Sequence, residues 1–429
     1  MNRKETFLAL VAMGILLITG SCHKMILDSE LMTEITQVEF PIDTIDGSHD
    51  WNLVKRQIVN VVARVPGDNI VKAQVLSGNP YETANTEILA EKLVQGGPYM
   101  SLYTEMPLTQ TDLWVAAVSS SGKYYVLPYP GSGEVRFDGA GVISSGTLQR
   151  PVPQAFTYLF EENFPLTGDF DFNDVVLRIS REFVSANTLK LHVTLAAVGA
   201  SKMIGAAIRL PSIDYEDVED ITIDEGKRFD ENYPVRRYFI DNEAIYTRGI
   251  DGTAVINLFD DAHWVLNPEA KNGRIMRLYY NTTGERENVS AIVPTQSRTY
   301  TIVVKEGTNI SQIALSTIDP FIIENSNSTN MEVHTYKYKS AQVLWQYHNG
   351  GGTISNRMTW ALLLPTSAFQ YPIEGMPIGR YRNGENVGAY CRYNHSFGQW
   401  GRNKNTSQDW WLYPASSLVY QSPTSAEEQ

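Results

Sequence analysis

Four oxygen-bearing side chains fall within six consecutive residues of this 429-residue chain, at Asp169, Asp171, Asn173 and Asp174. No Lys or Arg lies among them, so the segment contains nothing that neutralises its own carboxylates. Hard cations such as Ca²⁺ take about 6–8 oxygen ligands from carboxylate, amide and carbonyl groups. The segment therefore predicts a structural Ca²⁺ site. Glu162, a short distance upstream, is a candidate for a fifth ligand.

The oxygen-bearing residues of this segment alternate with phenylalanines, which suggests that the two kinds of side chain lie on opposite faces. On an extended chain, alternate side chains point to opposite faces. Asp169, Asp171 and Asn173 would then face a metal, while Phe170 and Phe172 would anchor the other face in a core. We expect an acidic loop that opens a β-strand.

The segment begins like an EF-hand loop, with D-x-D-x-N, and then departs from it. Asp174 stands where an EF-hand needs Gly, and Ser180 stands where it needs a bidentate Glu. The alternative to a metal site is a solvated acidic turn, whose Asp side chains cap nearby backbone N–H groups. The sequence leaves this alternative open, and it leaves Ca²⁺ against Mg²⁺ open as well.

The same segment resembles a known family. Phe160-Glu-Glu-Asn-Phe-Pro followed by Gly-Asp-Phe-Asp-Phe-Asn-Asp-Val-Val is similar to the opening signature of the LruC domain, which occurs in secreted lipoproteins of Gram-negative bacteria. The usual Glu-Asp pair of that family is Glu161-Glu162 here. The resemblance spans roughly residues 150–415, and it implies a β-rich, surface-exposed module of poorly defined function. Further similar segments follow in the order of the family, at 319–323, 332–334, 360–365, 369–375 and 409–413.

The first 22 residues resemble a bacterial lipoprotein signal. Arg3 and Lys4 precede an apolar run at 7–18, which is too short for a lasting transmembrane helix, and a lipobox ends at Cys22. We expect Cys22 to be acylated and to tether the chain to the outer membrane of a Gram-negative bacterium, at the cell surface, through residues 23–35. The alternatives are an ordinary cleaved signal peptide and display on the periplasmic face.

Composition narrows the function further. The net charge of −13 argues against nucleic-acid binding and suits divalent cations. Only two Cys are present, so if Cys22 carries lipid, Cys391 has no intramolecular disulfide partner. The many Tyr, Phe and Trp residues favour β-structure.

The expected fold is all-β, with two β-sandwich domains of which the C-terminal one is larger and carries the acidic loop. Short strand-like segments between turn residues support this class. One short helix is expected at 86–94, where Ile88, Leu89 and Leu93 have helical spacing. The expected divisions are an N-terminal sandwich at 36–138, a Gly/Ser/Pro linker at 139–153, an LruC-like β domain at 154–415 and a flexible tail at 416–429.

The chain contains none of the common catalytic motifs, such as H-E-x-x-H, G-x-S-x-G or a P-loop. Glu332 and His334 would share a face of a strand, either as a ligand pair or as a hydrogen-bonded structural His. Trp400, Trp410 and Trp411 lie in a segment rich in aromatic and amide side chains, which is typical of glycan or protein contacts but also of a packed domain edge.

Two functions are therefore open. The first is a non-catalytic binding or adhesion module that is stiffened by Ca²⁺. The second is a surface glycan-binding protein, or a glycan hydrolase with an unrecognised carboxylate pair. An open cleft with two facing carboxylates would favour the hydrolase.

Overall fold

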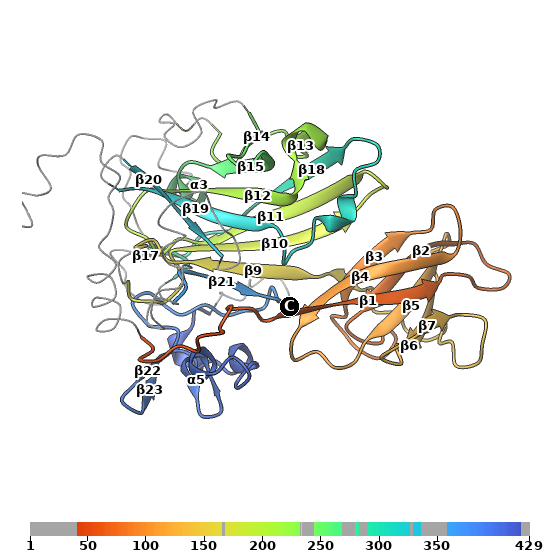
Figure 1. The fold of residues 1–429 in the computed structure, drawn as a ribbon, viewed down its shortest axis with the longest axis horizontal. Helices are drawn as coiled ribbons and strands as arrows, with labels where there is room; N and C mark the ends of the chain where they lie inside the picture. Colours follow the sequence, from red (N-terminus) through yellow and green to blue (C-terminus); the bar gives the residue numbers. More distant parts are fainter. Residues whose placement is uncertain are drawn as a thin grey trace, which may run out of the picture.

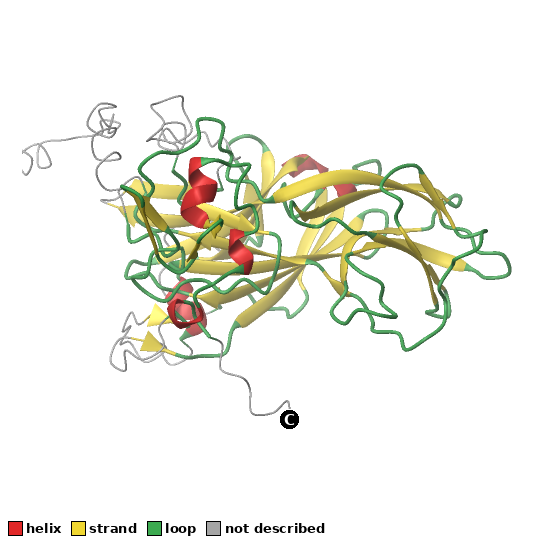
Figure 2. Ribbon diagram, turned by 90° about the horizontal axis from the view of Figure 1, so that it is seen from below, coloured by secondary structure: helices red, strands yellow, loops and turns green. Residues whose placement is uncertain are grey.

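The computed structural model describes residues 41–164, 168–231, 233, 244–267, 279–282, 290–326, 329–335 and 358–421. Over these residues the chain is mostly β-structure, arranged as a smaller and a larger β-sandwich (Figure 1). The helices among them are short, and they lie with the larger sandwich (Figure 2). The prediction of an all-β fold built from two sandwiches is confirmed.

The smaller sandwich packs a three-stranded sheet, in the order β4-β1-β7, against a five-stranded sheet, in the order β6-β5-β2-β3-β8. Alternation along β1 directs Val59 and Val61 into the core, while Ile58 and Asn60 face outward. The strands are β1 (Val54–Val62), β2 (Ile70–Leu76), β3 (Glu87–Leu93), β4 (Tyr99–Pro107), β5 (Trp114–Ser119), β6 (Tyr124–Pro128), β7 (Glu134–Arg136) and β8 (Val152–Pro153).

The larger sandwich packs a six-stranded sheet, in the order β13-β18-β11-β10-β9-β21, against a five-stranded sheet, in the order β14-β15-β12-β19-β20. Its core contains Leu177 and Ile179 of β10 together with Ile208 and Leu210 of β12. The strands are β9 (Ala155–Phe160), β10 (Val175–Phe183), β11 (Thr188–Ala197), β12 (Ile204–Asp214), β13 (Val218–Ile223), β14 (Tyr246–Arg248), β15 (Thr253–Phe259), β18 (Gln296–Val304), β19 (Asp319–Ser326), β20 (Thr329–His334) and β21 (Ala361–Leu364).

Shorter elements surround the larger sandwich. They are the helices α3 (Ala262–Leu266) and α5 (Phe397–Arg402), the 3₁₀ turns η1 (Tyr215–Asp217), η3 (Ile310–Gln312), η5 (Trp410–Leu412) and η6 (Ser416–Leu418), and the paired strands β16 (Tyr279–Tyr280) with β17 (Ser290–Ala291), β22 (Arg380–Arg382) with β23 (Glu385–Val387), and β24 (Cys391–Arg392) with β25 (His395–Ser396). No helix in the described part of the chain is both long enough and apolar enough to cross a membrane.

The helix predicted at 86–94 is wrong, because this segment forms β3. The backbone of β3 pairs with β2 on one side and with β8 on the other, and Leu89 and Ala90 are buried. Sheet pairing therefore outweighs the helical spacing of the apolar residues.

Residues 139–153 do not form a free linker. Val126 and Ile143 exchange two backbone hydrogen bonds, of 2.8 and 2.9 Å, and β8 adds to the edge of the five-stranded sheet. Only Gln154 separates β8 from β9. The Gly, Ser and Pro residues of this stretch therefore shape turns along the smaller sandwich.

The residues before β1 also differ from expectation, since they pack against the larger sandwich. Ile42, Ile45 and Trp51 belong to its core, and the Trp51 ring stacks on Phe397 at a centroid distance of 5.8 Å. Figure 1 shows this red segment beside the blue C-terminal elements. Along the sequence, the chain therefore first contributes to the core of the larger sandwich and then forms the smaller one.

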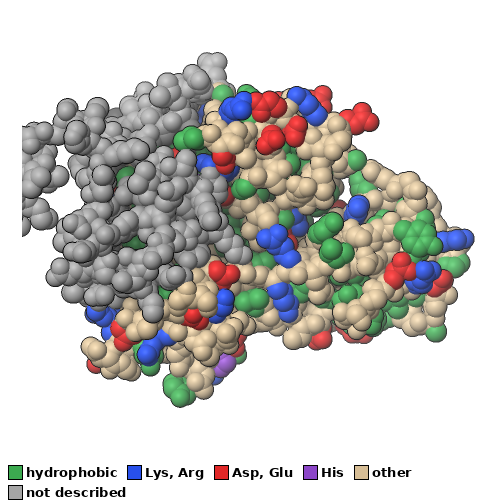
Figure 3. All heavy atoms as spheres, viewed as in Figure 1, with side chains coloured by type: hydrophobic (Ala, Val, Ile, Leu, Met, Phe, Trp, Pro, Cys, Tyr) green, Lys and Arg blue, Asp and Glu red, His purple; other side chains and the backbone are tan. Residues whose placement is uncertain are grey.

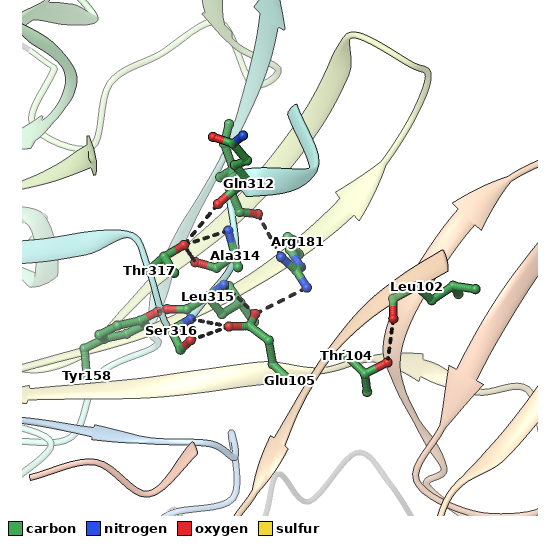
Figure 4. A network of polar contacts seen from close by, with 11 residues as sticks. Leu102, Thr104, Glu105, Tyr158, Arg181, Gln312, Ala314, Leu315, Ser316 and Thr317 are labelled. Carbon is green, nitrogen blue, oxygen red and sulfur yellow. Dashed lines mark hydrogen bonds and ion pairs between the residues drawn. The ribbon is translucent and has the colours of Figure 1, made fainter. Parts of the chain in front are cut away.

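A buried carboxylate joins the two sandwiches. Glu105 of β4 accepts hydrogen bonds from the backbone N–H groups of Leu315 (2.8 Å) and Ser316 (3.0 Å) and from the Ser316 hydroxyl (Figure 4). It also forms an ion pair with Arg181 of β10, which in turn donates to the carbonyl of Ile313. These contacts fix the junction between the sandwiches.

The junction leaves a recess in the molecular surface (Figure 3). It has a volume of about 280 Å³ and is lined by residues of both sandwiches, including Tyr99 and Tyr103 of β4 and Phe183 of β10. Tyr99 and Tyr103 are 68% and 58% exposed, respectively.

Candidate metal centre

The acidic residues lie in the loop that connects β9 to β10. Phe160 at the end of β9 pairs with Val175 at the start of β10, so the loop closes over one end of the six-stranded sheet. Glu161 and Asp174 are thereby held as neighbours at its two ends. Strand pairing, rather than the loop sequence alone, positions the carboxylates.

The loop backbone is left-handed at two bulky residues. Phe170 and Phe172 have φ angles of 56° and 55°, a region that residues with a Cβ rarely adopt. Both rings are buried, with Phe170 against Trp360 and Phe172 against Phe397. The expected separation of acids from aromatics is therefore present, but it arises from two left-handed residues instead of an extended strand.

Three carboxylates converge in this loop. Oxygen atoms of Glu161, Asp169 and Asp171 all lie within 4.8 Å of one another. Glu161 and Asp171 are buried, whereas Asp169 is exposed. The donor set consists of hard oxygen atoms, as Ca²⁺ and Mg²⁺ require.

Hydrogen bonds orient these carboxylates without using all of their oxygens. The Phe172 N–H donates to Glu161 Oε1 (2.5 Å), and the Gly375 N–H donates to Asp171 Oδ2 (2.8 Å). Within the described residues, Glu161 Oε2 and Asn173 Oδ1 are buried and have no hydrogen-bond partner. Buried acceptors are normally satisfied, so these two oxygens fit a ligand that the protein itself does not supply.

Burial raises the pKa of Glu161 well above its usual range, and the carboxylates of Asp174, Asp171 and Asp169 raise it further. Burial likewise raises the pKa of Asp171, followed by the charges of Asp169, Asp174 and Glu374. A bound cation would reverse this balance, because an opposite charge within a few ångströms favours the ionised carboxylate.

Of the expected ligands, Asp169 and Asp171 belong to the cluster. Asn173, in the same loop, has a buried side-chain oxygen without a hydrogen-bond partner among the described residues. Asp174 Oδ2 accepts from the backbone N–H of Glu162 at 2.5 Å. The Glu162 carboxylate faces Lys202, whose backbone N–H donates to it at 3.2 Å. Glu161, and not Glu162, is thus the residue of this pair that meets Asp169 and Asp171.

Glu374 is a further carboxylate that sequence reasoning missed. Its charge raises the pKa of both Asp171 and Asp174, and the Thr282 hydroxyl donates to its Oε2 at 3.4 Å. The neighbouring Gly375 binds Asp171 directly. The signal was its place in segment 369–375, which resembles the LruC family.

Two glycines allow the oxygens to pack this closely. A Cβ on Gly199 would lie 1.7 Å from Asn173 Oδ1, and a Cβ on Gly168 would lie 2.6 Å from Glu161 Oε2. The Gly199 N–H also donates to the carbonyl of Asn173 at 2.9 Å. Each glycine therefore lies against one of the two unpartnered oxygens.

The tryptophans expected to bind a ligand are mostly internal. Trp400 and Trp410 are 1% and 0% exposed and pack with Phe397 in the core of the larger sandwich, so the expectation that they offer a binding surface is wrong. Trp411 is half-buried, and its indole N–H donates to the carbonyl of Gln408. The rings of Phe397, Trp400 and Trp410 pack against each other and are not available for stacking on a ligand.

Glu332 and His334 form a hydrogen-bonded group instead of an open ligand pair. His334 is fully buried, with Nδ1 2.7 Å from Asp319 Oδ2 and Nε2 3.0 Å from Glu332 Oε2. Both ring nitrogens are occupied, which favours the structural interpretation. Cys22 and the rest of the predicted signal lie outside the described residues.

Comparison with known proteins gives a family but no activity. No functionally curated protein is detectably similar to the chain. A crystal structure of a predicted lipoprotein from Bacteroides ovatus shares 15% sequence identity, with a TM-score of 0.46, and the match covers 82% of this chain and 99% of the other. Residues 186–411, more than half of the chain, match the family described as a domain of unknown function, DUF4842; the match begins after the acidic loop and includes Glu374. The chain therefore belongs to the DUF4842 family.

Proposed function

We propose that the protein is a non-catalytic binding or adhesion module, stiffened by one structural Ca²⁺ and tethered to the outer membrane through Cys22. The observation that carries the metal site is the convergence of Glu161, Asp169 and Asp171, together with the unpartnered Oε2 of Glu161. Asn173 Oδ1 would supply a further ligand. The lipobox and the resemblance to LruC domains support display at the surface of a Gram-negative cell.

Calcium would act here by joining parts of the chain that are distant in sequence. The loop at 161–174 contacts the segment that contains Glu374 and Gly375. A divalent cation would neutralise carboxylates that otherwise repel each other in a buried site, and it would lock the loop to that segment. The dense buried cluster suits this role better than it suits a hydrolase, which needs one carboxyl group as an acid in an open cleft.

The test is thermal unfolding of the purified full-length protein in EDTA and across titrations of Ca²⁺ and Mg²⁺. A cation that binds only the folded state raises the melting temperature with its concentration. We expect Ca²⁺ to raise it at lower concentrations than Mg²⁺, and Glu161→Gln to remove the response. An unchanged melting temperature in EDTA and in both cations would identify the loop as an acidic turn that needs no metal.

A further inference from the structure

A pocket of about 650 Å³ lies on the outer face of the six-stranded sheet, and its lining includes none of the proposed metal ligands. Leu177 and Ile179 of β10 point into the core, so Arg178 between them points outward. The other walls come from residues 292–295, residues 367–371 and Tyr420. This volume is within the range of small-molecule sites, about 300–1,000 Å³.

Arg178 is the charged group of the pocket. Its side chain is half-buried and forms no ion pair or hydrogen bond among the described residues, and the guanidinium Nε is buried without an acceptor. A guanidinium in such a position normally has a carboxylate or carbonyl partner. The described residues of the lining include no Asp or Glu, so an arginine in this position favours an anion supplied by a ligand.

The rest of the pocket offers an aromatic wall and neutral polar groups. Tyr371 and Tyr420 stack at a centroid distance of 5.5 Å with an interplanar angle of 7°, and the Tyr371 hydroxyl donates to the carbonyl of Asn281 at 2.9 Å. Thr295 and Gln370 add hydroxyl and amide groups to the lining. Such a lining suits a ligand with an apolar ring face and several hydroxyl groups.

Residues 367–371, which form one wall of the pocket, are held at both ends by hydrogen bonds, so the pocket is formed before any ligand binds. The Thr157 hydroxyl of β9 donates to the carbonyl of Thr366 at 2.7 Å. At the other end, the Tyr420 N–H donates to the carbonyl of Tyr371 at 2.9 Å. A preformed site avoids the entropy cost of ordering its walls.

We propose that this pocket binds a carboxylate-bearing sugar of the uronic acid type, with the Arg178 guanidinium receiving the carboxylate. The planar guanidinium matches a carboxylate with two parallel hydrogen bonds. The hydroxyl and amide side chains bind ring hydroxyls, and the tyrosine pair borders the apolar face of the ring. This inference rests on the binding role proposed above and gives it a ligand class.

Isothermal titration calorimetry of the full-length protein with glucuronate and with glucose tests the proposal. We expect glucuronate to bind and glucose to bind roughly tenfold more weakly or not at all, since a charged hydrogen-bonded contact is lost. Arg178→Gln should weaken glucuronate binding by a similar factor, and Arg178→Lys should weaken it less, because the ammonium keeps the charge but not the paired geometry. Arg64→Gln removes an exposed arginine of the smaller sandwich and should change nothing.

Equal affinity for glucuronate and glucose, or unchanged binding by Arg178→Gln, would overturn the proposal. Inorganic phosphate that binds as tightly as glucuronate would also overturn it, because the pocket would then recognise negative charge alone and not a sugar. The Ca²⁺-induced rise in melting temperature is measured on the same Arg178→Gln protein, where it should persist and show that the variant is folded. Glucuronate binding without any response to Ca²⁺ in the wild type would support the pocket and contradict the metal site, so the two proposals can fail separately.

Discussion

Glu105 of the smaller sandwich lies 3.3 Å from the guanidinium of Arg181 in the larger one, and both side chains are largely buried. The Glu105 carboxylate also accepts two backbone hydrogen bonds and one hydroxyl hydrogen bond from Leu315 and Ser316. A single side chain of β4 is thus bound by two separate segments of the larger sandwich. This arrangement ties the orientation of the sandwiches to one ionised group.

Replacing Glu105 with Ala should lower the free energy of unfolding by about 3 kcal/mol or more, because it leaves Arg181 buried without its counter-charge. Urea denaturation measures the loss. The matched control is Glu134→Ala, which breaks the more exposed pair with Arg136 and should cost at most about 1 kcal/mol. Equal losses in the two variants would show that the junction does not depend on this carboxylate.

Asp171→Asn should have opposite effects with and without calcium. In EDTA, removing one of several repelling carboxylates should raise the melting temperature slightly. In saturating Ca²⁺, the same variant should melt below the wild type, since it lacks a ligand. Differential scanning calorimetry in the two buffers measures both signs.

The control for this pair of measurements is Asp138→Asn, which removes an exposed charge in the smaller sandwich. It should leave the melting temperature nearly unchanged in both buffers. A lower melting temperature of Asp171→Asn in EDTA as well as in Ca²⁺ would mean that the carboxylate stabilises the loop through its hydrogen bonds to Gly375 and Asn173, and not through a metal.

Gly199→Ala should disrupt the loop, because the added Cβ would overlap Asn173 Oδ1 at 1.7 Å. Either Asn173 moves or β10 shifts, and both outcomes disturb the end of the sheet that carries the carboxylates. We expect a loss of about 1–3 kcal/mol in the free energy of unfolding and a weaker response to Ca²⁺. Gly139→Ala has open space around its Cβ and serves as the control in the same denaturation series.

The protein should be less stable in mild acid, because the folded state requires His49 to be neutral. Its Nδ1 accepts from the Trp51 N–H (3.0 Å) and its Nε2 donates to the carbonyl of Trp400 (3.0 Å), an arrangement that requires the neutral ring. Burial lowers the pKa of His49 from 6.5 to about 4. The unfolded state therefore binds a proton more readily than the folded state between these two pH values.

The contribution of His49 is fully present above pH 6.5, declines as the pH falls towards about 4, and then levels off; in total it is about 3 kcal/mol. Urea denaturation at a series of pH values measures this decline. His49→Gln cannot take up the proton and should lose that part of the pH dependence. The same slope in the variant and the wild type would show that other groups cause it.

The segment in which the carboxylates converge could be predicted from sequence, because its four oxygen-bearing side chains at 169–174 have no Lys or Arg among them. The left-handed backbone of the two phenylalanines in this segment could not be predicted from their alternation with Asp. The choice between Glu161 and Glu162 could not be predicted either. It depends on how β9 ends, and neighbouring residues at the end of a strand point in opposite directions. Glu374 lay beyond local reasoning, since only the tertiary fold brings it to the loop.

The tryptophans show a different limit. Residue type indicates that Trp400 and Trp410 are aromatic and bulky, but not whether their rings face a ligand or each other. The packing partner that buries Trp400 includes Trp51, some 350 positions earlier. The local sequence around Trp400 gives no sign of its contact with Trp51, and therefore could not show that Trp400 is buried.

The hydrogen bond between Gly375 and Asp171 spans 204 positions of the chain and has a consequence for the order of folding. A contact of such sequence separation forms only after a long loop has closed, and loop closure is a slow, entropically opposed step. A cation held by the completed cluster would consequently bind after most of the larger sandwich has assembled. It would prolong the lifetime of the native state by slowing unfolding, and it would leave the rate of folding almost unchanged.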